Sequence, residues 1–186
     1  MIVELIKSSN LTSDSMLTEH ITDVFLHMKW ADAKIWTSVL ESEKATSDEE
    51  LLKILHHIHE TQHAFLSAWL SGTFQRQTFD SFDGVSELAA WGEDFHVSVL
   101  PYTEALTDKD LDKKIILPWA HYFSRVLGRK PGPTTIRETL HQLPSHSMHH
   151  RGQAARRLRE LEVAPPLMDY IVWVMGERPV IPWPNI

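Results

Sequence analysis

Residues 135–161 read TIRETLHQLPSHSMHHRGQAARRLREL, the pattern of one long amphipathic helix. The segment opens with Thr135 and Glu138, whose spacing is that of a capping box at a helix start. Pro144 lies inside the run and predicts a bend. The apolar residues recur at helical spacing on one stripe: Ile136, Leu140, Leu143, Ala154, Leu158 and Leu161. Such a stripe must pack against other elements.

Three further segments have the same helical pattern, at residues 15–42, 48–71 and 85–106. The second begins with another capping box, Ser47 and Glu50, and stops before Gly72. Pro101 is expected to kink or shorten the third. Four long amphipathic helices in 186 residues predict an all-α four-helix bundle, with a single domain over residues 1–186.

The helical pattern is interrupted at residues 108–134, before the fourth helix. Residues 113–119 look extended, and residues 128–133 form a turn-rich loop. A long connection at this point suggests an order other than simple up-down-up-down. Beyond the fourth helix we expect a short helical segment at residues 170–175 and a Pro-rich tail, so the core should span about residues 15–175.

Composition excludes several classes of protein. The chain is 42% hydrophobic and 23% charged, which is ordinary for a globular domain. Its net charge of -7 argues against nucleic-acid binding, and no stretch is long and apolar enough to span a membrane. The opening residues lack the apolar region of a secretory signal, so a soluble, cytoplasmic protein is expected. Cysteine is absent, which excludes disulfides, thiolate metal sites and cysteine nucleophiles.

Histidine is unusually frequent, with twelve in the chain, and most of them lie between His56 and His150. His146 and His150 are four residues apart, so their imidazoles lie one turn apart on the same helix face. This spacing lets two imidazoles bind one metal ion. It equally fits two core histidines that are hydrogen-bonded by neighbours. Both interpretations remain open on spacing alone.

The second helix could supply a third ligand from its own histidines. Geometry favours His59 and His63, which are four residues apart, with His56 on the same face. His57 lies on a different flank. A third histidine would complete a three-histidine site with open coordination positions. Spacing does not decide which residue supplies it.

At these residues the sequence resembles the DinB-like family, also called damage-inducible DinB or YfiT-like proteins. The strongest match is HSMHHRGQ at residues 146–153, which has the family's H-x-x-x-H-R-G-Q signature. HIHETQHAFLSAWLSG at 57–72 supports it, as does WAD at 30–32, where the family often has Trp-Ala-Asn. The matches extend over about residues 17–175.

The resemblance implies a four-helix bundle in which three histidines hold a divalent metal. By motif position these are His57, His146 and His150, which replaces the geometric preference because His57 lies eight residues before Phe65, as in the family pattern. Pro144 is not part of the signature and could shift the angle of His146. The ion could be Zn, Ni, Fe or Mn, since histidine alone does not discriminate among them. Family members are often dimers, so a homodimer is expected.

Some relatives resemble transferases or isomerases that use a low-molecular-weight thiol such as bacillithiol or mycothiol. The leading hypothesis is therefore metal-dependent S-transfer of a thiol cosubstrate to a small electrophile, since the chain has no cysteine of its own. One alternative is a metal-dependent hydrolase, with His149 or His59 as candidate general base. Another is a non-catalytic, stress-related metal-binding bundle. The expected partners are a small-molecule substrate and a second copy of the chain, with no nucleic acid and no membrane.

Overall fold

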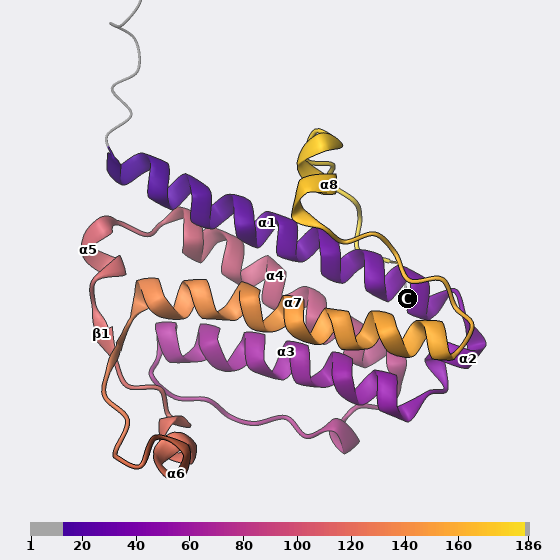
Figure 1. The fold of residues 1–186 in the computed structure, drawn as a ribbon, viewed down its shortest axis with the longest axis horizontal. Helices are drawn as coiled ribbons and strands as arrows, with labels where there is room; N and C mark the ends of the chain where they lie inside the picture. Colours follow the sequence, from indigo (N-terminus) through magenta and orange to yellow (C-terminus); the bar gives the residue numbers. More distant parts are fainter. Residues whose placement is uncertain (1–12, 185–186) are drawn as a thin grey trace, which may run out of the picture.

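The computed structural model describes residues 13–184, which form an all-α bundle as predicted. Its long helices are α1 (Ser13–Leu40), α3 (Glu49–Leu70), α4 (Val85–Glu104) and α7 (Ile136–Glu160), and the short α2 (Glu43–Thr46) follows α1 (Figure 1). The long helices are amphipathic, and in the described part of the chain none has the length and apolar character needed to cross a bilayer.

The four long helices are not arranged in simple up-down-up-down order. α1 packs against α4 and α7, as does α3, so α1 and α3 are diagonal. α1 and α7 run in one direction while α3 and α4 run in the other (Figure 1). Residues 71–84 therefore return along α3, where Arg76 bonds Glu60 and the Gln77 carbonyl accepts from His56. The crossover falls before α4, earlier than the connection at which the sequence suggested it.

The connection between α4 and α7 contains a short β-hairpin-like pairing and a projecting arm. β1 (Lys114–Ile115) and β2 (Thr134–Thr135) pair antiparallel, with Lys114 opposite Thr135. The pairing closes residues 116–133 into an arm that extends beside the bundle (Figure 1). The remaining short elements are η1 (Phe79–Ser81), α5 (Asp108–Leu111), η2 (Ala120–Phe123), α6 (Ser124–Leu127) and α8 (Tyr170–Met175).

Side-chain caps explain where two of the long helices begin. Thr135 and Glu138 form the predicted capping box of α7. At α3 the N-cap is Asp48 rather than Ser47, because Ser47 ends α2. Asp48 also accepts two hydrogen bonds from Arg157 on α7, at 3.0 and 2.7 Å. The same carboxylate thus caps α3 and ties it to α7.

The C-terminal tail belongs to the core. Trp183 is only 6% exposed. Its ring lies 6.3 Å from the His59 ring and 5.5 Å from the His96 ring, measured between centroids. The packed structure therefore extends past residue 175, where sequence periodicity placed its end. The reason is tertiary: a Pro-rich segment has no helical repeat, yet one large aromatic ring can still anchor it.

Candidate metal centre

Three histidines meet where α3 packs against α7. His57 comes from α3, and His146 and His150 come from successive turns of α7. The His57 ring centroid is 5.2 Å from that of His146 and 4.4 Å from that of His150, and the two α7 rings are 4.4 Å apart. One ligand nitrogen from each residue lies within 4.8 Å of the other two. In a tetrahedral site with bonds of about 2.0–2.1 Å these atoms would be about 3.3 Å apart, so small side-chain rotations suffice.

The protonation state of this group suits a metal. Burial, and then the neighbouring His150 and His57, together lower the pKa of His146 to about 4. Burial also lowers the pKa of His57. Both imidazoles are therefore neutral at pH 7, which is the form that ligates. Among the described residues, the buried Nε2 of His146 has no hydrogen-bond partner, as expected of an atom that ligates a metal.

A hydrogen bond fixes the orientation of the His150 ring so that its other nitrogen can bind a metal. Its Nδ1 donates to the side-chain oxygen of Gln153 at 2.7 Å, which leaves Nε2 free to bind a metal. The Gln153 amide nitrogen in turn donates to Nε2 of the exposed His149 at 3.2 Å. Three imidazoles with a polar partner behind one of them suit Zn²⁺ and the neighbouring divalent transition metals. The residues present therefore fit the divalent ion that the family resemblance implies.

Pro144 does not remove His146 from this group. α7 is continuous from Ile136 to Glu160 through the proline. His146, two residues later, still lies with His57 and His150. The helix thus accommodates the proline without displacing the ligand.

The other histidines of α3 point elsewhere. His63 donates from Nε2 to the Trp91 carbonyl at 2.8 Å and stacks on the Trp91 ring, with centroids 4.5 Å apart. His56 donates to the Gln77 carbonyl at 3.0 Å. The geometric preference for His59 and His63 is therefore wrong, because that face of α3 is directed at α4 and the core. The resemblance selected the histidine that faces α7.

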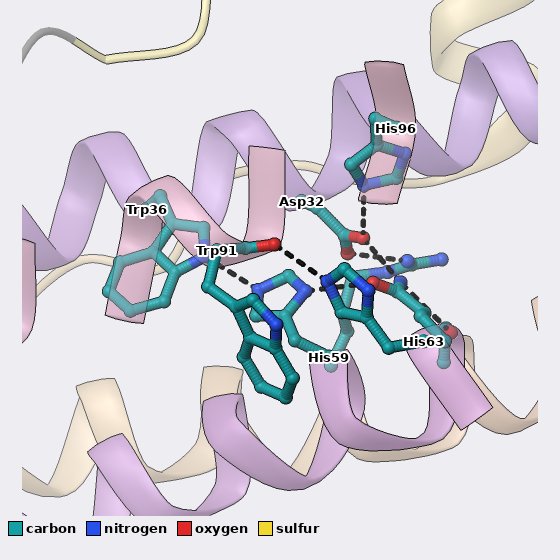
Figure 2. A network of polar contacts seen from close by, with 9 residues as sticks. Asp32, Trp36, His59, His63, Trp91 and His96 are labelled. Atoms are coloured by element: carbon teal, nitrogen blue, oxygen red, sulfur yellow. Dashed lines mark hydrogen bonds and ion pairs between the residues drawn. The ribbon is translucent and has the colours of Figure 1, made fainter. Parts of the chain in front are cut away.

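His59 lies in a buried polar network rather than at the metal group (Figure 2). Its Nε2 accepts from Trp36 at 2.8 Å and its Nδ1 donates to Gln62 at 2.7 Å. Burial lowers the pKa of His59 to about 4. The ring is 1% exposed and both nitrogens are engaged, so it cannot take a proton from a substrate. This geometry contradicts the suggestion that His59 is a general base. His149 remains exposed beside His150.

Asp32 is the centre of the same network (Figure 2). It accepts hydrogen bonds from Gln62 at 2.7 Å, His96 at 2.9 Å and Arg151 at 2.8 Å. Burial alone would raise the pKa of Asp32. The Arg151 charge and the His96 hydrogen bond outweigh burial and hold that pKa well below its usual range. Four helices, α1, α3, α4 and α7, thus meet at one carboxylate.

The network also braces the turn of α7 that carries the ligands. Arg151 directly follows His150, and Ser147 directly follows His146. Ser147 accepts a hydrogen bond from Gln62 at 3.3 Å. The residues next to both α7 ligands are therefore tied to the bundle interior. Sequence reasoning missed this arrangement, although Asp32, Gln62 and Arg151 all lie within the motifs that carry the resemblance.

A glycine on α4 makes room for His59. A Cβ atom at Gly92 would lie 2.6 Å from Nε2 of His59 and 2.7 Å from its Cε1. We expect Gly92→Ala to lower the free energy of unfolding by about 1–3 kcal/mol, since a buried hydrogen-bonded ring cannot move away freely. Thermal and urea unfolding measure this loss.

The matched control is Gly152→Ala. Gly152 also lies inside a helix, but it is exposed and a Cβ there meets nothing within 4 Å. Alanine favours helix over glycine by about 0.8–1.0 kcal/mol, so this variant should be at least as stable as the wild type. Equal destabilisation of both variants would show that the contact with His59 is unimportant.

Two open cavities meet at His57. The first, which we call the polar cavity, is about 540 Å³ and is lined by Glu49, Glu50, Lys53, Ile54, His57, His150 and Gln153. The second, which we call the aromatic cavity, is about 470 Å³ and lies between α3, the 71–84 connection and the arm. Its walls include Phe74, Trp119 and Tyr122. The metal group is thus reachable from two sides.

The fold and the histidine group define a helical bundle with a candidate metal centre between two of its long helices. The family model of the DinB family matches residues 16–177. Because the match covers most of the sequence, the chain belongs to the DinB family. A search of curated proteins found no match to this chain.

Proposed function

We propose that this protein is a divalent-metal-dependent enzyme that joins a low-molecular-weight thiol, through its sulfur, to a small electrophile. The observation that carries the proposal is the meeting of two separate cavities at His57. A two-substrate reaction needs two approaches to the reacting centre. A hydrolase needs only one organic substrate, so the second cavity favours transfer.

The chemistry follows from what the chain has and lacks. When bound, a divalent metal lowers the pKa of a coordinated thiol or water and so supplies a nucleophile at neutral pH. With no cysteine in the chain, the sulfur must come from a cosubstrate. In the reaction, sulfur bonds to the electrophilic carbon, the thiol proton is released, and the leaving group departs with its electron pair.

Different residues around the three histidines would bind the metal ion and the thiol. His57, His146 and His150 would hold the metal ion. The polar cavity, with Lys53 and Gln153 in its lining, offers charged and amide groups to a polar thiol. Its acidic residues, Glu49 and Glu50, can pair with an amino group on the same molecule.

Thiol-transfer assays test the proposal. A thiol with a pKa near 8.5 is only a few per cent ionised at pH 7, so complete ionisation alone raises the thiolate fraction roughly 30-fold. With Zn-, Ni-, Fe- or Mn-loaded protein we expect the reaction of at least one biological thiol with one electrophile to be roughly 30-fold faster than without protein. The His57→Ala variant should lose the acceleration.

Other outcomes separate the alternatives. Hydrolysis of esters or amides without thiol would support the hydrolase, for which the exposed His149 beside His150 is the candidate base. Metal binding with no turnover on either panel would contradict an enzyme and favour a non-catalytic metal-binding bundle.

A further inference from the structure

The aromatic cavity has the features of a ligand pocket. Its volume of about 470 Å³ falls within the range of small-molecule sites, roughly 300–1,000 Å³. Its floor is α3 and its far walls are the 71–84 connection and the arm, so segments distant in sequence converge on it. His57 lines it beside the candidate metal centre. A ligand in this cavity would therefore lie next to the metal group.

Aromatic rings form much of its wall. Phe74 comes from the 71–84 connection, while Trp119 and Tyr122 come from the arm. Trp119 is partly buried and held edge-on by Phe65, with ring centroids 5.1 Å apart and planes at 82°. Tyr122 is 74% exposed. The exposed ring of Tyr122 lies beside the packed ring of Trp119. Together they favour a flat aromatic ring as the ligand, because aromatic rings prefer stacked or edge-to-face contacts.

One ion pair, Arg76 with Glu60, lies in the same wall. Nε of Arg76 donates to Glu60 at 2.5 Å, and the Glu60 side chain is 13% exposed while that of Arg76 is 72% exposed. Glu60 is the only hydrogen-bond partner of Arg76 among the described residues, and a guanidinium carries five N–H donors. The pair therefore leaves donors for one further anionic group. The positive charge of a metal at His57 would also attract an anionic group.

We propose that the aromatic cavity is the electrophile site of the proposed transferase, on which this inference rests, and that it takes a small aromatic molecule carrying one carboxylate. The ring would contact Trp119 and Tyr122, and the carboxylate would accept from Arg76. The polar cavity on the other side of His57 has no Phe, Trp or Tyr in its lining and suits the polar thiol instead.

Calorimetric titration of 2-naphthoate into metal-stripped and Zn-loaded full-length protein tests the site without any assay of turnover. We expect one molecule to bind in both forms, more tightly with Zn. Arg76→Gln should weaken binding about tenfold, the effect of losing one charge-assisted hydrogen bond. Tyr122→Ala should weaken it too. Because both side chains are largely exposed, both variants should fold.

The controls lie on the adjoining α6. Arg125→Gln and Val126→Ala replace exposed residues of the arm that do not line the cavity. Both should bind 2-naphthoate as the wild type does. The uncharged analogue 2-naphthylmethanol should bind more weakly than 2-naphthoate, and Arg76→Gln should leave its affinity unchanged.

The outcomes distinguish this site from the proposed function. No binding of 2-naphthoate, or equal weakening in the pocket and control variants, would overturn the aromatic-acid site. Binding that depends on Arg76 and Tyr122 in a protein without transferase activity would uphold the site and reject the proposed reaction. Thiol transfer whose kcat/KM is unchanged in both pocket variants would uphold the reaction and reject the site.

Discussion

Replacing His150 by alanine should lower the affinity for a divalent transition metal by more than the ten- to hundredfold quoted for loss of an outer hydrogen-bond partner. His150 supplies one of the three ligand nitrogens that lie within 4.8 Å of one another. Its removal leaves two ligands on different helices. Competition titration with a chelating dye measures the change.

Two variants of neighbouring residues serve as comparisons for this loss of metal affinity. Gln153→Ala removes the oxygen that accepts from Nδ1 of His150, so it should cost about ten- to hundredfold. His149→Ala removes an exposed histidine outside the group and should change affinity little. An equal loss in His149→Ala and His150→Ala would place the metal elsewhere.

Replacing Asp32 by alanine should lower the free energy of unfolding by about 3–5 kcal/mol. The Arg151 side chain is 4% exposed and that of Asp32 is 2% exposed. Removal of the carboxylate leaves the guanidinium charge buried without a counter-ion, and it also takes the acceptor from Gln62 and His96. Urea unfolding at pH 7 measures the loss.

An exposed pair of the same residue types provides the control. Asp112 and Arg137 are 3.0 Å apart with side chains 74% and 39% exposed. Asp112→Ala should therefore cost less than about 1 kcal/mol. The double variant Asp32→Ala with Arg151→Met should be more stable than the sum of the single changes predicts. Strict additivity would contradict a coupled buried pair.

Local patterns were enough to predict most of the bundle. The fourth helix was expected at 135–161 and is Ile136–Glu160, because a capping box and a long apolar stripe mark it. The short segment at 170–175 is the helix α8. The long connection before the fourth helix was predicted, but its pairing of β1 with β2 was not. The place of the tail was not predicted either, because it depends on tertiary contacts such as those of Trp183 with His59 and His96.

In the candidate site, too, local spacing predicted some features while others depend on how the helices pack. The spacing of His146 and His150 predicted that they share a face. The choice of His57 came only from the resemblance, because α3 carries histidines on several flanks and only packing decides which flank meets α7. The buried network of Asp32 could not be foreseen, since its members come from four helices. The homodimer, the cytoplasmic location and the thiol cosubstrate stay predictions.

Anomalous diffraction from crystals of the Zn-loaded protein, collected at the zinc absorption edge, tests the central claim most directly. We predict one strong peak per chain, about 2.0–2.1 Å from a ring nitrogen of each of His57, His146 and His150. A peak at other residues, or none at this group in protein that holds one equivalent of zinc, would contradict the account.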